Sequence, residues 1–394
     1  MNALTQLFQR VFCGDRYMLA AIFLLMVVSI LSVYSSASVL AYQRMGGDTA
    51  HVLMRHCLLL VLSVSIMCFV SHLKPGVWSG LAWPLLFLAV VLQAATLLAG
   101  TSINGASRWL SVGGIQFQPS EISKIALMVF VARQLSTNEG NLPRAFWRIL
   151  VATMAIGALI LLENLSTCLL LVASVWVVMA VARVPFLYLG GTAAVVAAVV
   201  GVMIYFAPQL AEMNGSFERA LTWRARVERF VTDDADERNA GNYQAEQAKA
   251  AVSTGGLIGG RGPGNSYMKN FLPMAFSDFI FSIIIEEYGV FPGCVLVLAF
   301  YFTILARAVS VAKRCVVPFR TYLIFGLALM LTLQALINMS VGVGLIPVTG
   351  QTLPMVSMGG TSNFAMGLAF GMMLSVSSKV DSPANIGFVK SETA

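Results

Sequence analysis

Long apolar segments alternate with short polar segments along most of this chain. About 20 helical residues cross the ~30 Å hydrocarbon core of a bilayer, and ten apolar segments are predicted to do so, although the fourth is short for a span. These segments are Tyr17–Val39, Val52–Ser71, Leu81–Ala99, Ile122–Leu135, Phe146–Leu162, Leu165–Ala182, Phe186–Phe206, Phe279–Ala306, Thr321–Gly344 and Pro354–Ser377. The pattern predicts an all-α polytopic membrane protein with about ten transmembrane helices in one domain, residues 1–394.

One polar segment, residues 207–277, is much longer than the others. It lies between the seventh and eighth spans and is predicted to be a large extracytoplasmic loop. Within it, Trp223, Val227 and Phe230 share one helical face, while Arg224 and Glu228 share another. This spacing is typical of a helix lying in the membrane interface.

Composition agrees with the membrane assignment, because only 11% of the residues are charged and soluble domains have about 25%. The net charge of +7 is spread over many short loops, which does not indicate nucleic-acid binding. Lys and Arg in the short loops are concentrated on the side of the termini. The positive-inside rule therefore predicts that both termini are cytoplasmic. The six cysteines have no CxxC spacing, so neither a zinc site nor a disulfide framework is predicted.

Gly255–Gly264 cannot form a regular helix, because it contains six glycines and a proline. Two interpretations remain open. The backbone N–H groups could bind an anion, with Arg261 and Lys269 neutralising phosphate charge. Alternatively, the segment is simply a tight irregular loop that returns the chain to the membrane.

Polar residues also occur inside the predicted spans. Glu121 and Lys124 are three residues apart, so they share a helix face and can pair, for structure or for substrate contact. Gln334 and Asn338 are four apart in an apolar helix, where polar side chains usually bond to other helices. The Gly- and Pro-interrupted stretch that follows, 342–363, is tolerated at membrane depth only where it is buried or lines a cavity. We interpret it as one wall of a substrate groove.

Asp278 is the candidate with the strongest chemical implication. It stands where the long polar segment gives way to the eighth span, and a carboxylate at the bilayer edge is costly unless it has a partner or a task. A general base for a hydroxyl proton is one such task.

Three segments together resemble the SEDS (shape, elongation, division and sporulation) family: 105–124 with Phe117-Gln118-Pro119-Ser120-Glu121, 255–281 ending in Ser277-Asp278-Phe279, and 334–362 with Pro347-Val348-Thr349-Gly350. The resemblance implies a peptidoglycan glycosyltransferase that polymerises lipid II, a disaccharide-pentapeptide on undecaprenyl pyrophosphate. It implies Asp278 as the catalytic base. The implied substrate-binding residues are Arg261, Lys269, Arg108, Glu121, Lys124, Arg224, Arg226, Gln334, Asn338, Thr349 and Ser357.

The chain departs from the family pattern at two places. Glu163-Asn164 stands where the family usually has Pro-Asp, so a role for an acid at position 164 is not carried over. Met274 and Phe276 stand where the family commonly has Glu and His, so these positions cannot supply acid–base groups. The acid at 278 is retained.

The resemblance further implies the bacterial inner membrane, a class B penicillin-binding protein as transpeptidase partner, other division proteins and a place at the septum. The runs 104–109 and 222–230 are closer to the FtsW-like division branch than to the RodA-like elongation branch. Apolar outer faces of the last two spans are the expected docking surface for the partner. No cofactor or metal site is predicted, although a divalent cation assisting the pyrophosphate is left open. The alternatives are a lipid II flippase and a structural scaffold.

Overall fold

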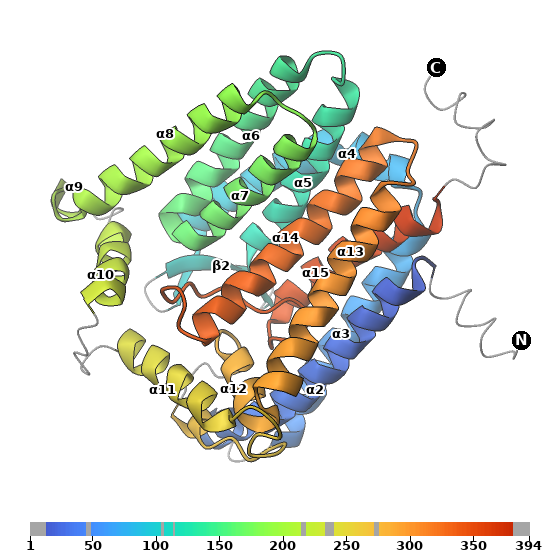
Figure 1. The fold of residues 1–394 in the computed structure, drawn as a ribbon. Helices are drawn as coiled ribbons and strands as arrows, with labels where there is room; N and C mark the ends of the chain where they lie inside the picture. Colours follow the sequence, from blue (N-terminus) through green and yellow to red (C-terminus); the bar gives the residue numbers. More distant parts are fainter. Residues whose placement is uncertain are drawn as a thin grey trace, which may run out of the picture.

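The computed structural model describes residues 13–44, 49–103, 106–112, 115–213, 218–232, 240–271 and 276–380. Its long helices form one bundle (Figure 1). The helices that match the predicted spans are α2 (Arg16–Arg44), α3 (Thr49–His72), α4 (Pro75–Ala99), α5 (Pro119–Thr137), α6 (Leu142–Glu163), α7 (Leu165–Val181), α8 (Phe186–Tyr205), α13 (Leu296–Ala312), α14 (Pro318–Gly342) and α15 (Gly360–Ser378). Seven of the described helices are long and apolar enough to cross a membrane. The predicted all-α membrane fold is confirmed.

Sequence signals explain where several helices begin. Pro75, Pro119 and Pro318 occupy the first turns of α4, α5 and α14, where the missing N–H costs nothing. Asn164 is shared between two helices, because it follows the last residue of α6 and its Oδ1 accepts a hydrogen bond from Thr167 N to cap α7. The Glu163-Asn164 pair is thus a helix junction in this protein.

The eighth span is not the continuous helix that was predicted. A short helix, α12 (Ile280–Tyr288), ends at Gly289, whose φ of 87° no ordinary helix allows. A π-helical turn, η3 (Val290–Val295), then leads into α13. Pro292 lies in that turn and lacks the N–H that a regular helix would use, which favours the irregular hydrogen bonding.

Two further segments differ from the helical prediction. The tenth helix begins at Gly360 and not at Pro354, and residues 343–359 form an irregular loop between α14 and α15. Three short antiparallel strands precede α5, in the order β1 (Thr101–Ile103), β2 (Ala106–Val112) and β3 (Ile115–Phe117). A search for long apolar segments does not detect strands as short as these.

The long polar segment contains the helices α9 (Ala207–Met213), α10 (Glu218–Thr232), α11 (Ala240–Gly255) and η2 (Met268–Asn270). In Figure 1, α9, α10 and α11 lie away from the start of α2 and the end of α15. The start of α2 and the end of α15 meet at the other end, because Asp15 N donates a 3.0 Å hydrogen bond to Ser377 Oγ. Arg307 of α13 also binds the Asp15 carboxylate there, at 2.5 Å. Burial alone would raise the pKa of Asp15, but hydrogen bonds from Arg307 and Met18 and the charge of Arg307 lower it below its usual value.

The last two spans lie at the centre of the bundle. Gly367 and Gly371 of α15 let α3 approach so closely that an added Cβ at Gly367 would lie 2.4 Å from Ser63 O. Among the described residues, no large exposed apolar side chain belongs to α14 or α15; such side chains lie on helices such as α2, α3, α4, α8 and α13. These two helices use most of their apolar faces for internal packing, and the docking of a partner on them stays a prediction.

Candidate functional site

The turn that carries Asp278 is fixed to the C-terminal third of the chain by three consecutive backbone carbonyls. Phe276 O accepts a hydrogen bond from Met358 N at 2.9 Å, and Ser277 O accepts one from Ser357 Oγ at 2.6 Å. Asp278 O accepts one from Asn338 Nδ2 at 2.9 Å. The Asp278 residue is half-buried at the start of α12. Its backbone position therefore depends on residues of α14 and of the 343–359 loop that are 60 or more positions away in sequence.

That loop is itself held by the two amide side chains of α14. Asn338 Nδ2 donates a second hydrogen bond to Gln351 O at 2.6 Å, and Gln334 Nε2 donates to Thr352 O at 3.1 Å. Ser357 Oγ accepts from Leu353 N at 2.8 Å while donating to the Asp278 turn. The prediction of a bond to another helix is confirmed for Gln334, which accepts from Lys124 of α5, whereas Asn338 bridges the loop and the Asp278 turn.

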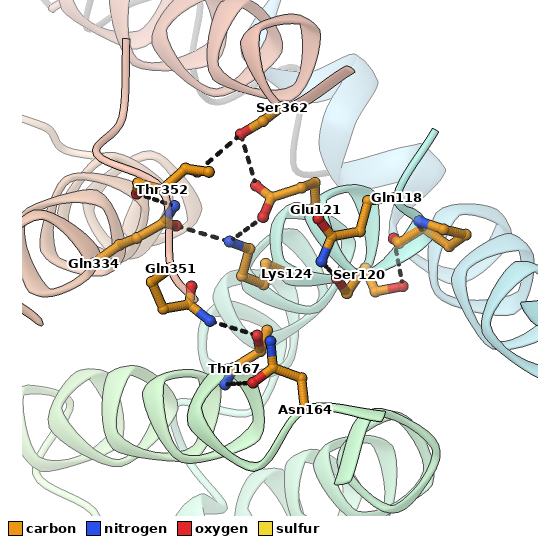
Figure 2. Close-up of polar contacts among 12 residues, drawn as sticks. Gln118, Ser120, Glu121, Lys124, Asn164, Thr167, Gln334, Gln351, Thr352 and Ser362 are labelled. Carbon is orange, nitrogen blue, oxygen red and sulfur yellow. Dashed lines mark hydrogen bonds and ion pairs between the residues drawn. The ribbon is translucent and has the colours of Figure 1, made fainter. Parts of the chain in front are cut away.

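A buried ion pair lies beside the same loop (Figure 2). Lys124 Nζ is 2.8 Å from Glu121 Oε1 and donates to Gln334 Oε1 at 2.7 Å, with the Lys124 side chain 0% exposed. Ser362 of α15 approaches the other Glu121 oxygen at 3.5 Å. Buried charges are tolerated when they are paired and hydrogen-bonded, and this pair connects α5, α14 and α15. The predicted Glu121–Lys124 pairing is confirmed.

The polar network continues to the junction of α6 and α7. Gln351 Nε2 donates to Thr167 Oγ1 at 2.6 Å, next to the Asn164 cap (Figure 2). Within the described part of the chain, three buried polar atoms near these segments have no hydrogen-bond partner: Asn164 Nδ2, Asn338 Oδ1 and Thr349 Oγ1. Unsatisfied buried polar atoms usually indicate a site for water or a polar ligand. Thr349 Oγ1 is one of these atoms, and substrate binding by Thr349 stays a prediction.

The two candidate arginines of α10 differ in their surroundings. Arg226 Nη1 donates to Val348 O at 2.9 Å, which ties α10 to the 343–359 loop. Arg224 instead pairs with Glu228 at 2.6 Å on the exposed face, as the i,i+4 spacing predicted. Arg226 thus belongs to the framework of the site, whereas Arg224 does not contact it. Arg108 lies in β2, but its side chain is outside the described residues.

The Gly-rich segment lies at the far end of α12 from Asp278. Arg261 N and Gly262 N donate to the carbonyls of Glu286 and Glu287, and Val290 N donates to Gly256 O. An added Cβ at Gly260 would lie 2.4 Å from Glu287 O, so the glycines allow close packing against the break after α12. The interpretation as a tight irregular loop is favoured, because the N–H groups of Arg261 and Gly262 are already bonded.

Arg261 and Lys269 remain near each other in this region. The Arg261 side chain is 42% exposed, and its Nε lies 3.6 Å from Glu286 Oε1. Lys269 Nζ donates to Gly264 O at 2.8 Å. Since α12 rises 1.5 Å per residue, Glu286 and Asp278 are separated by on the order of 10 Å. Arg261, through its partner Glu286, therefore lies toward the opposite end of α12 from Asp278.

Two buried carboxylates at this end of α12 were missed by the sequence interpretation. Glu286 accepts hydrogen bonds from Tyr267 N at 2.9 Å and from Ser266 Oγ at 2.5 Å, and Ser35 Oγ of α2 donates to Glu287. Two adjacent acids inside an apolar segment were a visible signal, since charged residues in spans are functional or structural by default. Here they orient the loop that carries Arg261 and Lys269.

Comparison with known proteins identifies the family. The family model covering FtsW, RodA and SpoVE, described as cell cycle protein, matches residues 15–382. The chain belongs to this family. It is 30% identical over 353 residues to a probable peptidoglycan glycosyltransferase FtsW of Aliivibrio salmonicida, covering 87% of this chain and 84% of that protein. It is 32% identical over 365 residues to the protein of the same name from Caulobacter vibrioides, covering 92% and 88%.

Solved structures of family proteins have the same fold. One, described as "Structural coordination of polymerization and crosslinking by a peptidoglycan synthase complex", matches with a TM-score of 0.74 at 26% identity, covering 93% of this chain and 98% of that chain. Thermus thermophilus rod shape determining protein RodA matches with a TM-score of 0.63 at 24% identity, covering 94% and 98%, which supports the fold alone.

Proposed function

We propose that this FtsW/RodA/SpoVE family member is a peptidoglycan glycosyltransferase that polymerises lipid II during cell division. The observation that carries the proposal is the anchoring of Asp278 by three successive carbonyls to Met358, Ser357 and Asn338. These bonds fix the backbone that carries the Asp278 carboxylate. The names of the FtsW relatives supply the reaction class.

In the proposed reaction, a sugar hydroxyl of one lipid-linked disaccharide attacks the anomeric carbon of another. The new C–O bond forms as the bond from that carbon to the pyrophosphate oxygen breaks, and the electron pair leaves with the lipid pyrophosphate. The Asp278 carboxylate accepts the hydroxyl proton as general base. Buried polar groups around Thr349 and Asn164 are suited to sugar hydroxyls, and the Glu121–Lys124 ion pair supports the loop through Gln334. A divalent cation assisting the pyrophosphate remains an open part of the proposal.

The setting is proposed from the same sources. Both termini would lie in the cytoplasm and 207–277 on the outer face of the bacterial inner membrane, with the protein at the septum. A crosslinking transpeptidase is the proposed partner, since the solved relative is described as coordinating polymerization and crosslinking. The apolar outer sides of α2, α4, α8 and α13 are available for such a partner or for lipid.

The test is Asp278→Asn, which keeps the shape and removes the proton acceptor. We expect polymer formation from labelled lipid II to fall by about 10²–10⁴-fold, with an unchanged melting temperature and unchanged lipid II binding. Ser253→Cys, an exposed substitution on α11, is the matched control. A stable Asp278→Asn protein that still makes glycan strands would remove Asp278 from the mechanism.

A second candidate, lipid II translocation, is favoured by one observation. Many polar side chains are buried inside the bundle, and Gln93 Nε2 donates to the buried Glu163 carboxylate at 2.8 Å. Intramembrane polar residues mark transport paths as well as catalytic sites. Proteoliposomes with labelled lipid II separate the two: a flippase moves the label across the bilayer without making polymer.

A further inference from the structure

A groove on the outside of the bundle lies behind α12, separate from the polar network around Lys124. Its volume is about 410 Å³, with α2 forming one wall and α12, η3 and α13 forming the other. The π-helical turn shapes it, because Gly293 presents no side chain and an added Cβ there would lie 2.9 Å from Ile284 O. The lining is apolar apart from Ser32 and Tyr288. Such a groove is suited to a hydrocarbon chain.

Its two polar groups indicate that the occupant is an amphiphile. Ser32 is fully buried and lines the groove, and among the described residues neither Ser32 Oγ nor the Tyr288 hydroxyl has a hydrogen-bond partner. Serine in a membrane helix ordinarily bonds to the carbonyl four residues earlier, as Ser36 does to Ser32 O. In a purely hydrocarbon environment both hydroxyls would lack a hydrogen-bond partner, which is unfavourable in free energy.

The end of the groove next to Tyr288 leads to the cationic loop. Gly289 follows Tyr288 and lies so close to Gly259 and Gly260 that an added Cβ would be 3.1 Å from Gly259 N. Arg261 comes next, with its exposed guanidinium stacked over Tyr267 at 5.9 Å, and Lys269 is tied to the same loop. An apolar groove that leads toward two cations, of which Arg261 is 42% exposed beside its Glu286 partner, is complementary to an anionic, lipid-linked headgroup.

The distance to Asp278 distinguishes the two lipid-linked substrates. In the donor, the reacting anomeric carbon is bonded directly to the pyrophosphate, which would then lie within a few ångströms of Asp278. In the acceptor, the reacting hydroxyl is at the far end of the disaccharide. Two sugar rings with bonds of about 1.5 Å span on the order of 10 Å, which matches the separation along α12 between Asp278 and Glu286, the partner of Arg261.

We propose that the groove between α2 and α12–η3–α13 holds the polyprenyl chain of the acceptor substrate, with its pyrophosphate at Arg261 and Lys269. The assignment rests on the proposed glycosyltransferase function, in which the acceptor hydroxyl gives its proton to Asp278. It makes α12 a spacer that sets the distance between the acceptor pyrophosphate and the catalytic base.

A photo-crosslinking experiment tests the binding site without turnover. The probe is an acceptor-only analogue: the polyprenyl-linked disaccharide with a CH₂ group in place of the anomeric oxygen and a diazirine on the chain. With the full-length protein in proteoliposomes, we expect crosslinks to peptides of α2 and α13. Leu31→Trp, which fills the groove, should reduce labelling about tenfold, as if contacts to roughly two methylene groups were lost.

Two further variants and one lipid probe serve as controls for this experiment. Tyr34→Trp places the same ring on the exposed side of α2 outside the groove and should not change labelling, while Leu296→Trp fills the groove from α13 in case Leu31→Trp does not fold. Equal labelling by diazirine-tagged phosphatidylglycerol would overturn the assignment in favour of a bulk-lipid site. So would unchanged labelling in both groove-filling variants.

A kinetic comparison separates the inference from the proposed function. Leu31→Trp should raise KM about tenfold for a long-chain acceptor, but not for a short-chain acceptor or for a donor whose outer hydroxyl is blocked. A raised KM for the donor alone would contradict the acceptor assignment. If groove-specific crosslinking occurs but no variant or wild-type protein makes glycan, the proposed function fails while the lipid site stands.

Discussion

At the scale of single residues, two roles are open for the Glu121–Lys124 pair: it can stabilise the fold, or it can contact the substrate. Lys124→Met leaves the buried Glu121 carboxylate without its cation, and breaking a buried pair in this way costs on the order of 3–5 kcal/mol. We expect a large fall in melting temperature in detergent. The double variant Glu121→Gln/Lys124→Met should recover much of that loss, because no unpaired charge remains.

The activity of the double variant decides the role of Lys124. If the pair only holds α5 against α14 and α15, polymerisation recovers with stability. If Lys124 contacts substrate, the double variant is stable but inactive. A single Lys124→Met variant with unchanged melting temperature would contradict the structural role of the pair altogether.

Residue spacing predicted some contacts of the site and could not predict others. The Glu121–Lys124 pair is visible as i,i+3, and Gln334 and Asn338 are visible as i,i+4 in an apolar helix. The bond from Lys124 to Gln334 joins positions 210 residues apart, and the bond from Asn338 to Asp278 O joins positions 60 apart. No local pattern encodes such contacts, because they depend on how the helices pack.

At the scale of elements, the break between α12 and α13 is the feature that organises the outer end of the site. Gly260→Ala should destabilise the protein by more than the ~1–2 kcal/mol of a positive φ, since the new Cβ would also lie 2.4 Å from Glu287 O. Gly256→Ala is the matched control: its φ is also positive, at 64°, but nothing lies within 4 Å of the new Cβ. Thermal melting of both variants separates the two costs, and equal losses would show that the close approach does not matter.

Hydropathy placed all ten helices but not their irregularities. A window of apolar residues continues through Gly289 and Pro292, so the sequence predicted one helix where the backbone changes direction. The apolar pattern also predicted that the tenth helix begins at Pro354. In the structure Pro354 lies in the irregular loop, where its carbonyl accepts a hydrogen bond from the Tyr301 hydroxyl. The length and apolarity of a segment therefore predict the irregular backbone of the candidate site least well.

At the scale of the whole molecule, the two ends of the bundle are built from different segments. Asp15, Arg307 and Ser377 join the start of α2 and the end of α15, and Arg320 donates to Lys379 O at the same end. The other end carries α10, α11 and the Asp278 turn. If the proposed lipid-linked substrate is presented outside the cell, this second end must face outward, and the Lys and Arg residues of the short loops predict the same orientation.

Cysteine labelling in intact cells tests that orientation. In a background without the six native cysteines, Ser253→Cys on α11 and Lys313→Cys after α13 both place a thiol at an exposed position. We expect a membrane-impermeant maleimide to label Ser253→Cys from outside and to label Lys313→Cys only after the membrane is opened. The reverse pattern would put Asp278 and Arg226 on the cytoplasmic side, where a wall polymerase cannot work, and would favour a different task for the site.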